Sequence, residues 1–168
     1  MNKKTLISLL HKEKFIKHGI FVLRSGKVSS YYCDIKQTLG NPKVIRMLTD
    51  GLATLVPNGA TCIAGSGYGG LTLASLVAYK KGLPLTLVRD VVKHHGTKQR
   101  FEGYLPGKKD VVCIIDDVYT TGSSLRDTKT KLMKTGCRFT KPIVALNRSE
   151  EKSVIALLTS KDIEIKKK

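Results

Sequence analysis

The chain has 168 residues, of which 41% are hydrophobic and 26% are charged. This length and balance fit one globular domain and exclude a chain that is disordered over most of its length. Lys and Arg number 30 against 13 Asp and Glu, so the net charge is +17. Such a surplus indicates anionic partners, either phosphates or nucleic acid, although a lysine-rich source genome would produce it equally.

Apolar stretches such as VVCII are far shorter than the roughly 20 residues of a membrane-spanning helix. The four cysteines lie far apart and form neither a zinc-binding nor a disulfide pattern. We therefore expect a cytoplasmic protein with no membrane segment.

The first elements are two helices separated by a pair of strands. Residues 3–17 carry apolar side chains at helical spacing, with Gly19 as a plausible stop. Residues 19–23 and 30–36 then predict two strands joined by a turn. Asn41-Pro42 predicts the start of the next helix, because Asn is a good N-cap and Pro suits the first helical position.

From residue 61 onward, short apolar strands alternate with helices. The strands TCIA, LTLV, VVCII and PIVAL are separated by a helix around residues 73–80 and a helix after residue 122. This order predicts an α/β fold with a mostly parallel central sheet and helices on both faces. We expect one domain over residues 1–168, with a helix and strand pair in 1–40 and a basic tail in 160–168.

Ligands of such sheets bind at the carboxyl ends of the strands, where three loops are expected. These loops are GSGYGG, RDVVKHHGTKQRFEG and DDVYTTGSS. In the third, Asp116 and Asp117 can accept hydrogen bonds from sugar hydroxyls or hold hydrated Mg²⁺. The hydroxyls and amides from Thr120 to Ser124 suit a phosphate at a helix N-terminus. Together they predict a ribose 5-phosphate site, although an ordinary helix N-cap after a strand would look similar.

The stretch VVCIIDDVYTTGS resembles the phosphoribosyl diphosphate signature of type I phosphoribosyltransferases. Two further segments are similar to orotate phosphoribosyltransferases: FVLRSGKVSSYYCD to their N-terminal hood, and VRDVVKHHGTKQRFEG to their mobile catalytic loop. Arg148 follows PIVALN, where that family places the arginine that pairs with the carboxylate of orotate. The resemblance covers residues 15–150 and implies the type I phosphoribosyltransferase fold with a small N-terminal hood.

The resemblance implies transfer of the 5-phosphoribosyl group from phosphoribosyl diphosphate to orotate, which gives orotidine 5′-monophosphate and pyrophosphate in pyrimidine biosynthesis. No covalent enzyme intermediate is needed, so catalysis depends on positioning and on cations near the departing charge. The implied cofactor is Mg²⁺, held mainly by the phosphoribosyl diphosphate with Asp116 and Asp117 nearby. Because the family shares its mobile loop between subunits, the resemblance also implies a homodimer.

The same resemblance implies the site residues. The expected catalytic residues are Arg89, Lys93, His95, Asp116 and Asp117. Orotate is expected to contact Tyr32, Cys33, Thr120 and Arg148. The sugar diphosphate is expected to contact Arg24, Tyr68, Gly69, Arg89, Lys93, His95, Asp116, Asp117, Val118, Tyr119, Thr120, Thr121, Gly122, Ser123 and Ser124.

Several of these residues have simpler interpretations. The segment Lys93 to His95 can be a solvated basic loop, Arg148 an ordinary surface arginine, and Tyr32 a half-buried strand residue. Two positions depart from the family, because Asp90 replaces a usual lysine and Gly69 stands where many bacterial members have lysine. The chain is also compressed after Arg148, at SEEKSV.

These departures leave two alternatives open. The first is a phosphoribosyltransferase that acts on a purine or another base. The second is a regulator that binds phosphoribosyl diphosphate, or nucleic acid through the +17 charge, and has lost catalysis.

Overall fold

The computed structural model describes residues 2–22, 26, 28–90, 100–149 and 151–163. The N-terminal part contains α1 (Lys3–Lys12), β1 (Ile16–Val22), β2 (Val28–Cys33), the 3₁₀ helix η1 (Lys36–Gly40) and α2 (Pro42–Leu55). The central part contains β3 (Cys62–Ser66), α3 (Gly67–Lys81), β4 (Leu85–Val88) and β5 (Phe101–Gly103). The remainder contains β6 (Val111–Tyr119), α4 (Ser123–Met133), β7 (Arg138–Phe139), β8 (Ile143–Asn147), β9 (Ile155–Thr159) and α5 (Ser160–Ile163).

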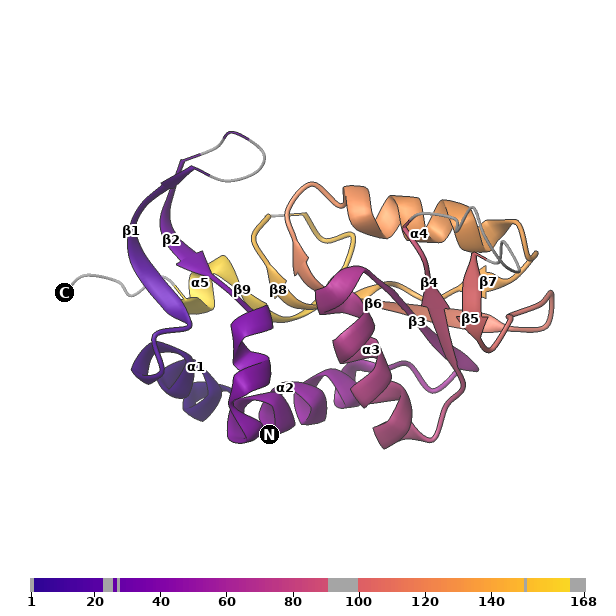
Figure 1. Cartoon of the computed structure of the whole chain (residues 1–168), viewed down its shortest axis with the longest axis horizontal. Helices are drawn as coiled ribbons and strands as arrows, with labels where there is room; N and C mark the ends of the chain where they lie inside the picture. Colours follow the sequence, from indigo (N-terminus) through magenta and orange to yellow (C-terminus); the bar gives the residue numbers. More distant parts are fainter. Residues whose placement is uncertain (1, 23–25, 27, 91–99, 150, 164–168) are drawn as a thin grey trace.

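The central sheet has the strand order β5-β4-β3-β6-β8-β9, with β7 beside the start of β6. Strands β4, β3, β6, β8 and β9 are parallel, and only β5 is antiparallel to its neighbour among the described strands. Helices α1, α2 and α3 lie on one side of the sheet and α4 on the other (Figure 1). The predicted α/β class with a mostly parallel sheet is therefore confirmed.

The main core lies between the sheet and the helices α1, α2 and α3. Its fully buried side chains include Leu48 and Leu52 of α2, Ile63 of β3 and Leu146 of β8. A second cluster lies under α4 on the opposite face and includes Leu132 and Val112. Burial on both faces explains why these strands read as continuous apolar runs in the sequence.

The N-terminal hairpin, formed by β1 and β2, stands apart from the main sheet and is called the hood below (Figure 1). The predicted bounds at the start of the hood are wrong. Helix α1 ends at Lys12 rather than Lys17, and β1 begins at Ile16 rather than residue 19. The chain turns at Lys14, which has a φ of 56°. A non-glycine residue in this left-handed conformation is uncommon, so the sequence carried no signal for the early helix end.

Two predicted bounds in the second half are also wrong. Strand β6 continues past Ile115 to Tyr119, because its later part pairs with β8. The segment after Arg148 contains an unpredicted strand, β9, which pairs with β8 and leads into α5. Ile163 at the end of α5 is fully buried, so this part of the predicted basic tail packs into the fold.

Among the described residues, no helix has the length and hydropathy to cross a bilayer.

Candidate active site

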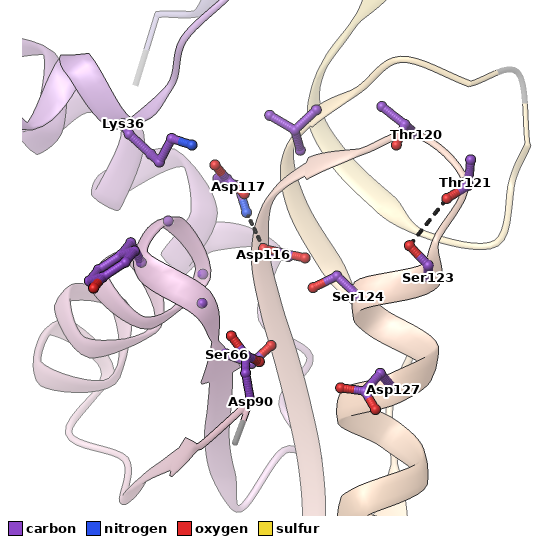
Figure 2. Close-up of a pocket in the computed structure, with 15 residues that line it drawn as sticks. Lys36, Ser66, Asp90, Asp116, Asp117, Thr120, Thr121, Ser123, Ser124 and Asp127 are labelled. Carbon is purple, nitrogen blue, oxygen red and sulfur yellow. Dashed lines mark hydrogen bonds between the residues drawn. The ribbon is translucent and has the colours of Figure 1, made fainter. Parts of the chain in front are cut away.

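A cavity of about 720 Å³ opens at the carboxyl ends of β3 and β6, between the N-termini of α3 and α4. This is the sheet edge where the topology predicts a ligand. Figure 2 shows Asp116 and Asp117 on β6, Thr120 and Thr121 on the turn that follows, and Ser123 and Ser124 at the start of α4. The cavity is lined by Lys36, Ser66, Gly67, Tyr68, Gly69, Gly70, Asp90, Asp116, Asp117, Val118, Thr120, Thr121, Ser123, Ser124 and Asp127.

The two adjacent acids differ in their surroundings. Asp116 is buried, whereas Asp117 is half-buried and donates its backbone N–H to Asp116 Oδ1 at 2.9 Å. Burial, and then the charge of Asp117, raise the pKa of the Asp116 carboxyl to about 7. A carboxyl that titrates near neutral pH can either donate or accept a hydrogen bond with a sugar hydroxyl.

The turn after β6 presents hydroxyls to the cavity. Thr120, Thr121, Ser123 and Ser124 are all exposed there. The first amides of a helix have no acceptor within that helix, and α4 begins at Ser123. Arg126 fixes the turn, because its Nη1 donates to the carbonyl of Thr121 at 2.7 Å. The arrangement can therefore hold a phosphate group.

The predicted glycine-rich loop is instead the end of β3 and the first turn of α3. Gly70 packs against β6 so closely that a Cβ atom would lie 2.8 Å from Asp116 Oδ1. A Cβ atom on Gly69 would overlap the carboxylate of Asp117. A side chain at position 69 would therefore require the Asp117 carboxylate to move. Tyr68, which precedes these two glycines in the cavity wall, is 90% exposed.

A second cavity of about 340 Å³ adjoins the first and shares Lys36, Asp117, Val118 and Thr120 with it. Its walls also come from the hood and from the end of β8. The four residues predicted to contact orotate all line this cavity: Tyr32, Cys33, Thr120 and Arg148. The structure thus brings together the expected base-binding residues, although Arg148 lies more than 100 positions after Tyr32 and Cys33 in the sequence.

Arg148 joins the hood to the body of the protein. Its Nη2 donates to Ser29 Oγ at 2.7 Å and to the carbonyl of Tyr31 at 3.0 Å. The guanidinium carbon also lies 4.6 Å from the ring centre of Tyr31, a cation–π contact. Arg148 is therefore held in place beside the cavity rather than free on the surface. Burial raises the pKa of the neighbouring Cys33 thiol to about 12, so this side chain is a neutral wall group.

Tyr119 has a structural position behind the phosphate turn. Its side chain is buried, and a Cβ atom on Gly122, whose φ is 71°, would lie 2.6 Å from the tyrosine ring. Its hydroxyl donates to Glu151 Oε2 at 2.6 Å, and its carbonyl accepts from the Arg148 amide at 2.9 Å. Tyr119 therefore connects the turn after β6 to the turn that carries Arg148, and it is not among the residues that line the main cavity.

The expected loop residues are only partly described. Arg89 pairs with Glu102 and lines a separate cavity of about 360 Å³, which borders the main one at Gly67, Tyr68 and Asp90. The structure does not bring the Arg89 guanidinium to the acids of β6. Arg24, Lys93 and His95 lie outside the described residues.

Lys36 is a candidate that the sequence analysis missed. This exposed cation of η1 lines both the main and the adjoining cavity. Figure 2 shows its amine pointing toward Asp117. The sequence offered no signal, because Lys36 was predicted as the last residue of a strand rather than as part of a helical turn at a cavity.

The described residues provide oxygen atoms suited to Mg²⁺, a hard cation, at Asp116, Asp117 and the hydroxyl turn. Among these residues, no group of three or more His, Cys, Asp and Glu side chains is placed to hold a metal ion by protein ligands alone. This donor set fits an ion held mainly by a bound diphosphate.

Comparison with known proteins identifies relatives over most of the chain, although no protein-family model matches it. An orotate phosphoribosyltransferase from Methanopyrus kandleri is 39% identical over 89% of this chain and 80% of the relative. One from Methanosarcina acetivorans is 34% identical over 96% of this chain and 91% of the relative. The crystal structure of orotate phosphoribosyltransferase from Aeropyrum pernix matches with a TM-score of 0.80 and 30% identity, covering 94% of this chain and 95% of that one. The chain therefore belongs to the orotate phosphoribosyltransferase family, the pentosyltransferases of pyrimidine biosynthesis.

Proposed function

We propose that the protein transfers a 5-phosphoribosyl group from phosphoribosyl diphosphate to orotate, with the two substrates bound in the two adjoining cavities. The observation that carries this proposal is their arrangement. The larger cavity combines two acids with a phosphate-binding turn, and the smaller one holds the four expected base-binding residues. Asp117, Val118 and Thr120 line both cavities, which supports a ribose bound between the phosphate and the base.

In this proposal each end of the sugar has its own binding groups. The 5-phosphate binds at the turn from Thr120 to Ser124, and the ribose hydroxyls bind Asp116 and Asp117. The diphosphate extends toward the first turn of α3, where Tyr68 and Gly69 lie in the wall. Glycine allows the main chain to approach an anion closely at this position.

Orotate lies in the smaller cavity, with its carboxylate toward Arg148. A guanidinium presents a fork of donors that matches a planar carboxylate. One ring nitrogen of orotate bonds to C1 of the ribose while the bond from C1 to the pyrophosphate oxygen breaks. The bonding electrons leave with the pyrophosphate, which also takes up the proton that the ring nitrogen loses. Bound Mg²⁺ supplies positive charge that stabilises this leaving group.

The remaining parts of the proposal come from the family resemblance. Arg24, Arg89, Lys93 and His95 supply cations around the diphosphate, and closure of the loop that contains Arg89, Lys93 and His95 excludes water. The loop serves the neighbouring subunit of a homodimer, and the enzyme works in the cytoplasm as a single domain. Nucleic acid is not part of this function.

The test mixes the full chain with Mg²⁺, orotate and phosphoribosyl diphosphate and follows the loss of orotate absorbance. We expect consumption of orotate, with equimolar pyrophosphate formed. If orotate persists while adenine, guanine or hypoxanthine is consumed, the base assignment is wrong. If no base reacts, yet calorimetry shows Mg²⁺-dependent binding of phosphoribosyl diphosphate, the chain is a sensor and not an enzyme.

A further inference from the structure

Lys131 is a buried cation that the proposed mechanism does not use. It lies on α4, and its side chain is only 7% exposed. Its Nζ pairs with Asp127 Oδ2 at 2.5 Å, one turn earlier on the same helix. Nζ also donates to the carbonyl oxygens of Arg89 at 3.2 Å and Asp90 at 3.4 Å. An ammonium has three protons, so these acceptors use its full capacity.

The carboxylates beside Lys131 belong to the main cavity. Asp90 Oδ1 lies 3.9 Å from the Lys131 Nζ atom, and both Asp90 and Asp127 line the cavity. Their side chains are 63% and 57% exposed. Figure 2 shows Asp127 on α4 and Asp90 at the end of β4. Without a nearby cation, two such charges on the wall would repel an anionic ligand.

Lys131 also holds the backbone at the point where the chain leaves β4. The amide of Arg89 donates to the carbonyl of Arg100 at 3.0 Å, which closes the base of the segment between them. The carbonyl of Arg89 binds Lys131, and its guanidinium pairs with Glu102. The first residues of the expected catalytic segment are therefore tied to both α4 and β5.

We propose that Lys131 is a positioning residue that fixes the start of the catalytic segment and offsets the charges of Asp90 and Asp127. This inference rests on the proposed function, because it concerns how the same cavity accepts phosphoribosyl diphosphate. It also accounts for an aspartate at position 90. The cation that offsets this aspartate comes from α4, 41 positions along the chain.

The principal test is Lys131→Met, which keeps most of the side-chain volume and removes the charge. We expect the KM for phosphoribosyl diphosphate to rise about tenfold, the effect of one unit charge at roughly 10 Å in an effective dielectric of about 20. We expect kcat to change less than KM. Lys129→Met is the matched control, because it removes one charge from the exposed face of the same helix, where Lys129 lies over the Phe139 ring. The KM of this control should stay at the wild-type value.

The double variant Lys131→Met/Asp90→Asn separates charge compensation from a merely structural role. Removing the uncompensated carboxylate should return KM to within about threefold of wild type. If KM stays high in the double variant, or does not rise in a folded Lys131→Met protein, the inference is wrong. If Lys131→Met does not fold, the KM of the single variant Asp90→Asn for phosphoribosyl diphosphate tests the proposal instead. This substitution should lower KM two- to threefold, because Lys131 then balances Asp127 and no net negative charge is left among these residues, and an unchanged KM would contradict the proposal.

Calorimetry with Mg²⁺ and phosphoribosyl diphosphate distinguishes this inference from the proposed function. Wild-type protein that binds no phosphoribosyl diphosphate would overturn both. Tight binding by wild type and equally tight binding by Lys131→Met would overturn only the role of Lys131.

Discussion

At the residue scale, the candidate site contains a carboxyl group, Asp116, that is protonated over a wider pH range than a solvent-exposed aspartate. Burial and the neighbouring Asp117 raise the pKa of Asp116 to about 7, whereas its unfolded value is near 4. Between these two pH values the folded chain binds more protons at this carboxyl than the unfolded chain does. The stability contributed by Asp116 is therefore fully present below about pH 4 and is lost as the pH rises toward 7.

Asp116→Asn should remove this pH dependence, because an amide has no proton to lose in this range. The stability of the variant relative to wild type should increase from pH 5 to pH 8, by about 1.4 kcal/mol for each unit of pKa shift and by a few kcal/mol at most. Thermal or denaturant unfolding of both proteins across this range measures the difference. A difference that is independent of pH would contradict the raised pKa.

Arg148 shows at the same scale how a ligand-binding group is positioned by contacts with the hood. Arg148→Met keeps an unbranched side chain but removes the guanidinium, and with it the donors to an orotate carboxylate and the contact with the Tyr31 ring. We expect the KM for orotate to rise about 30-fold, equivalent to about 2 kcal/mol, and the KM for phosphoribosyl diphosphate to change less than about threefold. Arg138→Met, an exposed arginine on β7, is the control for loss of one charge. Equal losses for both substrates would show that Arg148 does not select the base.

At the scale of elements, the cavity exists because α3 packs directly on β3 and β6. A Cβ atom on Gly65 of β3 would lie 2.7 Å from both the Ala74 Cβ and the carbonyl oxygen of Gly70 in α3. Gly70 in turn approaches the Ile115 carbonyl and the Asp116 carboxylate of β6. These glycines let the start of the helix approach the acids of β6, so the close contact of two elements sets the depth of the site.

Gly70→Ala should therefore disturb both the packing and the site. The added methyl would lie 2.8 Å from Asp116 Oδ1 and 3.2 Å from the Ile115 carbonyl, so α3 or Asp116 must shift. We expect a loss of about 1–3 kcal/mol in unfolding free energy and weaker binding of phosphoribosyl diphosphate, measured by denaturation and calorimetry. Gly40→Ala is the control, because a Cβ atom there meets nothing within 4 Å. Equal stability of the two variants would show that the contact at Gly70 is not tight.

At the scale of the whole molecule, the proposed base-binding cavity forms where the hood meets the body. The Tyr31 hydroxyl and Ser160 Oγ are 2.8 Å apart, and Arg148 contacts Ser29 and Tyr31. Residues from both ends of the chain thus hold the hood against the body beside this cavity. The proposed homodimer would add a further level, because the segment that contains Lys93 would serve the site of the other subunit.

This sharing of segments predicts recovery of activity when two impaired variants are mixed and assayed at an orotate concentration below the wild-type KM. Arg148→Met damages the body of a site, whereas Lys93→Ala damages the segment given to the neighbour. In a mixed dimer one site carries both changes and the other carries neither, so unfolding and refolding an equimolar mixture should restore about a quarter of wild-type activity. No recovery in a mixture shown to contain dimers would contradict loop sharing.

The sequence by itself determined the order of strands and helices, and it located the acids and the phosphate turn. These features depend on local patterns, namely apolar runs, helix caps and a contiguous motif from Val111 to Ser123. It did not predict the early end of α1, because Lys14 adopts a left-handed conformation without glycine. It also missed β9, whose identity as a strand depends on pairing with β8.

Only the tertiary structure decided which distant residues share the site. Arg148 meets Tyr32 and Cys33, and Lys131 meets Asp90, because the hood, β8 and α4 converge on one edge of the sheet. Contacts between residues so far apart depend on packing of whole elements, and no local pattern encodes their distances. The same packing buries Asp116, and burial, which a sequence does not display, is what shifts its pKa.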